Sequence, residues 1–179
     1  MSREVVITSG VRTAIGTFGG SLKDTPPTEL AALVVRESLT RAGVEGKDVG
    51  HVVFGHVVNT EAKDMYLSRV AAIHGGCAEG TPAFNVNRLC GSGLQAILSA
   101  SQSILLGDAD IAIGGGAENM SRAPYVSLAT RFGARMGDSK MIDMMTGALH
   151  DPFHSIHMGV TAENIAAKWG ITREDQMLS

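Results

Sequence analysis

The chain alternates short apolar runs, rich in β-branched residues, with longer segments of helical periodicity, and this alternation most restricts its fold. Strands are predicted at residues 5–9, 51–55, 82–87 and 109–114. Helices are predicted at residues 28–42, 64–74, 91–106 and 160–169, each followed by a glycine. Strands that alternate with helices predict an α/β fold with a mainly parallel sheet.

The helix predicted at residues 91–106 is apolar on almost every side and carries no charged residue. A helix that is apolar all round is buried on all sides. We therefore expect it to be the buried central helix of a βαβαβ-type domain. No uninterrupted apolar run reaches the roughly 18 residues that a membrane helix needs, so a membrane is not an expected partner.

A change of composition near Ser121 divides the chain. We predict one domain over residues 1–120 and a second, loop-rich region, with several methionines and arginines, over residues 121–179. At Thr172 the sequence indicates the start of a further helix, with acidic residues in its first turn, yet few residues follow. We expect the chain to be the first part of a longer protein.

Composition excludes several classes of protein. Hydrophobic residues make up 44% and charged residues 18%, which is typical of a globular protein. The net charge is −3 without a dominant basic patch, so nucleic acid is not an expected partner. Two cysteines are too few for a disulfide framework, and the first apolar stretch is too short for a signal peptide. We expect a cytoplasmic protein.

Cys90 is the strongest candidate for chemistry, in the run NRLCGSG at residues 87–93. It lies between a predicted strand and the start of a helix, where free N–H groups and the helix dipole favour a thiolate nucleophile. The same N–H groups could hold the oxygen of a tetrahedral intermediate, and Gly91 and Gly93 leave room for a substrate. The alternative is a small buried apolar residue. Cys77 lacks a comparable setting, and we expect it to be non-catalytic.

Two other patterns are weaker. His150, His154 and His157 are spaced so that one helix could present them to zinc, but Pro152 argues against such a helix, and we predict no metal site. The glycine run at residues 114–116 follows a strand but lacks the GxGxxG spacing of a dinucleotide site.

Four separated runs carry a resemblance to the thiolases. The run NRLCGSGLQAI at residues 87–97 resembles their active-site cysteine block, and GVRTAIG at residues 10–16 resembles their N-terminal signature. GGGAENMS at residues 114–121 and HMGVTAEN at residues 157–164 are similar to two more blocks. The resemblance spans essentially the whole chain but only the N-terminal half of the usual family length, and it is strongest to bacterial β-ketothiolases.

The resemblance implies the thiolase fold and an acyltransferase that interconverts acyl-CoA plus acetyl-CoA with 3-oxoacyl-CoA plus CoA. Cys90 would carry the acyl group as a thioester, and its backbone N–H would contribute to an oxyanion hole. The resemblance places His157 and Met158 near the CoA pantetheine and the acyl pocket. It implies coenzyme A thioesters as substrates and no further cofactor.

The resemblance also implies a dimer contact at residues 114–116 and a loop domain, beginning at residue 121, that binds CoA and helps to form tetramers. In the family, the activating His and the second Cys lie in the C-terminal half, and the N-terminal domain recruits a further strand after the loop domain, beyond this chain. We therefore expect an open sheet edge and no turnover by this chain alone. Two alternatives stay open: an inactive fragment that only dimerises or binds CoA, and a condensing enzyme of the ketoacyl synthase group.

Overall fold

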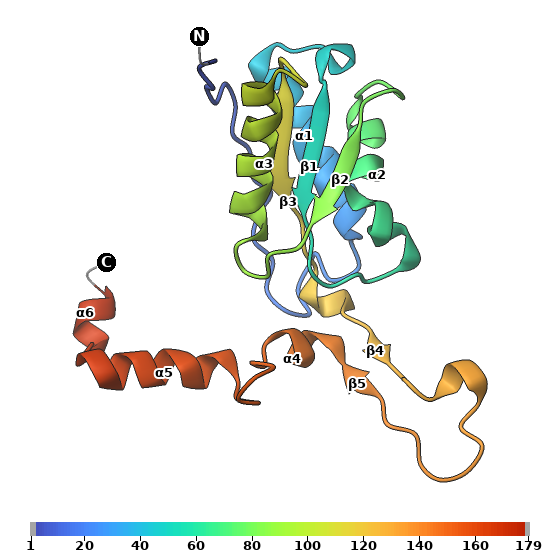
Figure 1. Ribbon diagram of the computed structural model, residues 1–179, viewed down its shortest axis with the longest axis vertical. Coiled ribbons are helices and arrows are strands. Elements are labelled where there is room, and N and C mark those ends of the chain that lie inside the picture. Colours follow the sequence, from blue (N-terminus) through green and yellow to red (C-terminus); the bar gives the residue numbers. More distant parts are fainter. Residues whose placement is uncertain (1–2, 178–179) are drawn as a thin grey trace. The chain divides into compact units, whose positions relative to one another are not determined.

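The computed structural model describes residues 3–177, which divide into two compact units after Pro124 (Figure 1). Each unit is described by itself. The first unit contains a parallel sheet with helices on both faces. The second contains a short antiparallel ribbon and three helices. The predicted α/β class with a parallel sheet is confirmed.

The sheet has three parallel strands in the order β2–β1–β3. Their bounds are β1 His51–Gly55, β2 Ala83–Val86 and β3 Ala112–Gly116. Val52 of the central strand is level with Ala83 on one side and Ile113 on the other. β1 is apolar along most of its length because both of its faces are covered.

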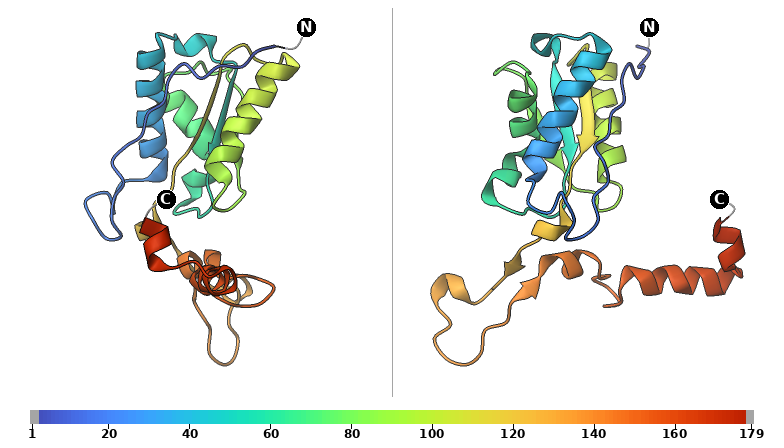
Figure 2. Two further views of the ribbon diagram at one scale, coloured as in Figure 1. Left: turned by 90° about the vertical axis from the view of Figure 1, so that its left-hand side faces the viewer. Right: turned by 180° about the vertical axis from the view of Figure 1, so that it is seen from behind.

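Two helices cover one face of the sheet and one covers the other (Figure 2). The helices are α1 Pro27–Ala42, α2 Leu67–Gly75 and α3 Ser92–Leu106. Alternation along β1 sends Val52 and Phe54 into the core with α1 and α2, while Val53 packs against Ala96 and Ala100 of α3. The central strand therefore joins two apolar cores.

The ends of α1 show one predicted feature and one difference. Gly43 ends the helix in the left-handed conformation, with φ 64°, as its position in the sequence indicated. The helix begins at Pro27, one residue before the predicted start, with Pro26 in the cap position. Proline suits the first helical turn. Thr28 is the second residue of the helix and is buried in the unit.

The glycine run after residue 113 belongs to strand β3 itself. A Cβ on Gly114 would lie 2.7 Å from the Cα of Ile97 in α3, and a Cβ on Gly115 would lie 2.9 Å from the ring of Phe54. These glycines allow α3 and Phe54 to approach the strand closely. This packing explains the run without a phosphate-binding loop.

The predicted N-terminal strand is wrong for this structure. Residues 5–9 belong to no ladder, and Val6 and Ile7 are 67% and 81% exposed. A cleft of about 1210 Å³ is lined by this segment and by β3, α3 and α1. Figure 2 shows the segment, in dark blue, outside the three-stranded sheet. The cleft separates it from the free edge of β3, so the two backbones cannot form hydrogen bonds.

The expected burial of α3 on all sides is also not found. Only Ser92, Ala96 and Ala100 of this helix are buried, whereas Leu94 and Leu106 are 65% and 78% exposed. The small side chains face the sheet, and the large ones face outward. By length and composition the window Leu89–Leu106 could also cross a membrane, although no uninterrupted apolar run in the sequence predicts this. A core helix of an α/β protein has the same composition.

Shorter elements complete the chain. The 3₁₀ turns are η1 Gly46–Asp48, η2 Ala62–Tyr66, η3 Met120–Arg122 and η4 Thr130–Phe132. The second unit contains β4 Tyr125–Val126, β5 Ile142–Asp143, α4 Met144–Ala148, α5 Met158–Trp169 and α6 Arg173–Met177. In the described part of this unit, no helix or strand contains a buried residue. That residues 121–179 begin a CoA-binding domain stays a prediction.

Candidate active site

The carboxyl ends of the three parallel strands meet at one edge of the sheet. β1 ends before His56, β2 leads into the turn that carries Cys90, and β3 ends before Ala117 and Glu118. Ligands of open α/β sheets bind outside the carboxyl ends of the strands. This edge is therefore the candidate active site of the first unit.

Cys90 lies in the turn between β2 and α3, two residues before the first helical residue. The residue is exposed. Gly91 occupies the cap position, and a Cβ on Gly93 would meet no atom within 4 Å. The thiol thus lies at the N-terminus of a 15-residue helix, beside open space. The structure agrees with the location predicted for Cys90, while its catalytic role stays a prediction.

The backbone of this turn is tied by its own hydrogen bonds. The N–H groups of Gly91 and Ser92 donate to the carbonyl oxygens of Arg88 and Leu89, each at 3.0 Å. The guanidinium of Arg88 donates to the side-chain oxygen of Gln95, one helical turn into α3. This contact ties the turn to the first part of α3.

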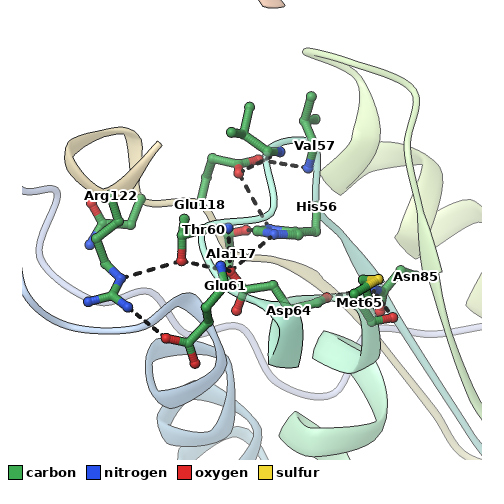
Figure 3. A network of polar contacts seen from close by, with 12 residues as sticks. His56, Val57, Thr60, Glu61, Asp64, Met65, Asn85, Ala117, Glu118 and Arg122 are labelled. Carbon is green, nitrogen blue, oxygen red and sulfur yellow. Dashed lines mark hydrogen bonds and ion pairs between the residues drawn. The ribbon is translucent and has the colours of Figure 1, made fainter. Parts of the chain in front are cut away.

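A polar network that the sequence motifs do not predict occupies the same edge (Figure 3). The Glu118 carboxylate accepts hydrogen bonds from the N–H groups of Val57 and Val58 at 2.9 and 3.0 Å. His56 is buried, and its Nδ1 lies 2.8 Å from the carbonyl oxygen of Ala117 and 3.4 Å from the Glu118 carboxylate. A carbonyl oxygen only accepts, so Nδ1 carries the proton. These contacts join the loop after β1 to the loop after β3.

Asp64 continues this network on the other side of His56. One of its carboxylate oxygens accepts from the N–H and the hydroxyl of Thr60, both at 2.7 Å, and lies 3.8 Å from Nε2 of His56. Arg122 binds the same threonine and the Glu61 carboxylate, at 3.3 and 2.7 Å. The network is a scaffold for the loop at residues 56–66. The only feature of the sequence that indicated this network is the presence of polar residues soon after the buried strands.

Cys77 has a different environment from Cys90. It is 7% exposed and belongs to the apolar core between the sheet and helices α1 and α2. Burial raises the pKa of the Cys77 thiol, because the thiolate is poorly solvated there. A neutral, enclosed thiol suits packing rather than nucleophilic chemistry, as expected for this residue.

His157 and Met158 belong to the second unit, whereas Cys90 belongs to the first. His157 caps the start of α5: its Nδ1 accepts the N–H of Gly159 at 3.0 Å. In the neutral ring Nε2 then carries the proton and is free to donate. Met158 is the first residue of α5 and is 38% exposed.

The three histidines considered for zinc do not share a helix. His150 and His157 pair as an antiparallel bridge, with ring centroids 5.5 Å apart, while His154 binds Asp151 at 2.8 Å. Pro152 lies in the turn between them, as its helix-breaking chemistry indicated. Residues 3–177 contain no group of three or more His, Cys, Asp or Glu side chains that could hold a metal ion.

The chain is similar over nearly its whole length to proteins of one family. The family model described as "Thiolase, N-terminal domain" matches residues 5–177. The chain is 70% identical over 176 residues to a beta-ketothiolase, BktB, of Cupriavidus necator, covering 98% of this chain and 45% of that protein. It is 45% identical to an acetyl-CoA acetyltransferase of Pseudomonas aeruginosa, covering 97% of this chain and 44% of the relative.

Solved structures show the same fold. The Bacillus anthracis acetyl-CoA acetyltransferase matches with a TM-score of 0.91 at 40% identity, over 98% of this chain and 44% of that one. Human mitochondrial 3-ketoacyl-CoA thiolase, crystallised with CoA, matches with a TM-score of 0.89 at 37% identity, over 94% and 43%. The chain spans about half the length of the curated relatives that it matches.

Proposed function

The chain belongs to the thiolase family, and from that premise we propose that Cys90 accepts an acyl group from acyl-CoA as a thioester. The observation that carries this proposal is the position of Cys90, exposed at the N-terminus of α3 and at the carboxyl edge of the sheet. That position combines an accessible sulfur with the positive end of a helix dipole.

The proposed step exchanges one thioester for another. The Cys90 sulfur attacks the thioester carbonyl carbon, the carbon–sulfur bond to CoA breaks, and CoA leaves as a thiolate that takes up the proton released by Cys90. The oxygen is negatively charged in the tetrahedral intermediate. The backbone N–H of Cys90 is the donor that we assign to it, since the hydrogen bonds of the turn use the N–H groups of its neighbours.

We assign the complete reaction to the longer protein whose length the relatives indicate. There, the acyl-enzyme would react with the α-carbon of acetyl-CoA to give 3-oxoacyl-CoA and free CoA, and the reverse would be thiolysis. This condensation needs a base for the α-proton, and the resemblance places that base outside this chain. Residues 3–177 place no histidine in a hydrogen bond with Cys90.

For the second unit we propose a role in binding CoA. The free Nε2–H of His157 would donate to a carbonyl oxygen of the pantetheine arm, and Met158 would contact the acyl chain.

We also propose a homodimer or homotetramer in the cytoplasm for the full-length protein. The alternative function is a fragment that dimerises or binds CoA without chemistry. A ketoacyl synthase is disfavoured, because the family model and the relatives are thiolases.

Intact-mass spectrometry after incubation with acetyl-CoA tests the acyl transfer. We expect one acetyl adduct on the chain and none on Cys90→Ser. Cys77→Ser is the matched control, since it removes the buried thiol and leaves the turn intact, and it should be acetylated like the wild type. If no condition gives an adduct, the alternative of an inactive fragment replaces the proposal.

The same preparation tests the expected incompleteness of the site. We expect no 3-oxoacyl-CoA from acetyl-CoA alone. Turnover near the typical enzyme rate, on the order of 10 per second, would show that this chain contains its own base.

A further inference from the structure

The residue before Cys90 has an unusual backbone conformation. Leu89 has a φ of 47°, in the left-handed region that residues other than glycine rarely adopt. Its side chain is 58% exposed, so side-chain packing does little to hold this conformation. Such strain persists only where surrounding contacts impose it.

Ser92 supplies most of these contacts. Its hydroxyl donates to the carbonyl oxygen of Leu89 at 2.6 Å and accepts the N–H of Arg88 at 2.9 Å. Its own N–H also donates to the Leu89 carbonyl oxygen. Ser92 is buried although it carries a polar side chain, and these bonds satisfy that side chain. Ser92 therefore binds the backbone on both sides of the Arg88–Leu89 peptide.

Two further residues support this arrangement. The side-chain oxygen of Asn87 accepts the Leu89 N–H at 3.0 Å from the exposed side. On the buried side, Gly55 at the end of β1 lets the helix start approach the sheet. A Cβ on Gly55 would lie 2.6 Å from the carbonyl carbon of Ser92 and 2.7 Å from its Cβ. The position of Ser92 is thus fixed by the central strand.

We propose that Ser92, with Asn87, is a positioning residue for Cys90. By holding Leu89 in the left-handed conformation, the two side chains set the direction of the Cys90 sulfur and of its backbone N–H. Both groups must meet the same thioester carbonyl, the sulfur at carbon and the N–H at oxygen. This inference rests on the proposed function, because it concerns the geometry of that acyl transfer.

The rates of acetylation and of alkylation of Cys90, measured on each variant, distinguish the positioning of its sulfur from the exposure of its sulfur. Acetylation by acetyl-CoA needs an aimed sulfur and an oxyanion donor, whereas alkylation by iodoacetamide needs only an accessible thiolate. For Ser92→Ala we expect acetylation of Cys90 to slow about tenfold or more, with alkylation little changed. Ser101→Ala is the control, because its hydroxyl binds only a carbonyl within α3, and both rates should match the wild type.

A second pair of variants keeps the test decisive. Adding Leu89→Gly to Ser92→Ala should restore part of the acetylation rate, because glycine adopts a positive φ without strain. Asn87→Ala removes only an exposed contact, so it should fold even if Ser92→Ala does not, and it should also slow acetylation more than alkylation. Equal slowing of both reactions, or no slowing of either, would overturn the inference. If the wild type itself is not acetylated, the proposed function fails and the inference fails with it.

Discussion

At the scale of single residues, the two cysteines show how environment decides the chemistry of a side chain. Cys90 stands exposed at a helix start, and Cys77 is enclosed in the core beside α2. The sequence predicts the setting of Cys90, since a glycine-rich run between a strand and a helix implies an exposed turn. It cannot predict the enclosure of Cys77, because that depends on side chains from three other elements.

We predict that iodoacetamide labels Cys90 and leaves Cys77 unlabelled in the folded chain. Burial raises the pKa of Cys77, so its thiol stays neutral at pH values where an exposed thiol ionises. A raised folded pKa also means that its contribution to stability is present below the unfolded pKa and is lost as the pH rises toward the folded one. Peptide mapping checks the labelling, with denatured protein as the control in which both cysteines react. Equal labelling of both in the folded chain would contradict this.

At the scale of elements, α3 has two faces with different roles. Toward the sheet it presents Ala96 and Ala100, which pack against Val53 and face a strand made largely of glycine. Away from the sheet it presents large apolar side chains to solvent. The uniformly apolar sequence predicts the helix but not which face is covered, because coverage depends on neighbouring elements.

Substitutions on the two faces of α3 should differ in their effect on stability. Ala96→Leu adds volume where no exposed area remains, and we expect a loss of about 1–3 kcal/mol in the free energy of unfolding. Leu98 lies on the outer face and is 48% exposed. For Leu98→Lys we expect the free energy of unfolding to change by no more than about 0.5 kcal/mol. Urea denaturation followed by circular dichroism measures both. A large loss for Leu98→Lys would mean that this face is covered in solution.

Local signals predicted the elements that local contacts determine. The strand predicted at residues 51–55 has those bounds, and α1 and α3 end at the predicted glycines. The segment at residues 5–9 has the composition of a strand but pairs with no neighbouring strand. Its apolar pattern therefore predicted a strand that the structure does not contain. In the candidate site, Cys90 was predictable from its motif. The contact between His56 and Glu118 was not, because it joins residues 62 positions apart through the fold.

At the scale of the whole molecule, the first unit exposes surfaces that globular domains usually cover. The free edge of β3 and the N-terminal segment line a cleft of about 1210 Å³, and the outer face of α3 is apolar. Open strand edges and large apolar patches favour association. The relatives are roughly twice as long as the matched region, so their remaining half is a candidate to cover these surfaces.

We predict that the chain alone associates as its concentration rises, and that the unmatched half of the Cupriavidus necator beta-ketothiolase forms a defined complex with it. In the complex, backbone amides of β3 should exchange more slowly with solvent, because a strand in the cleft would pair with the free edge. Light scattering measures the association, and hydrogen exchange measures the protection. Ile7→Lys, in the wall of the cleft, should weaken the complex. Leu128→Lys, equally exposed but in the second unit, is the matched control and should not. A chain that stays monomeric with β3 already protected would show that the cleft is closed without any further segment.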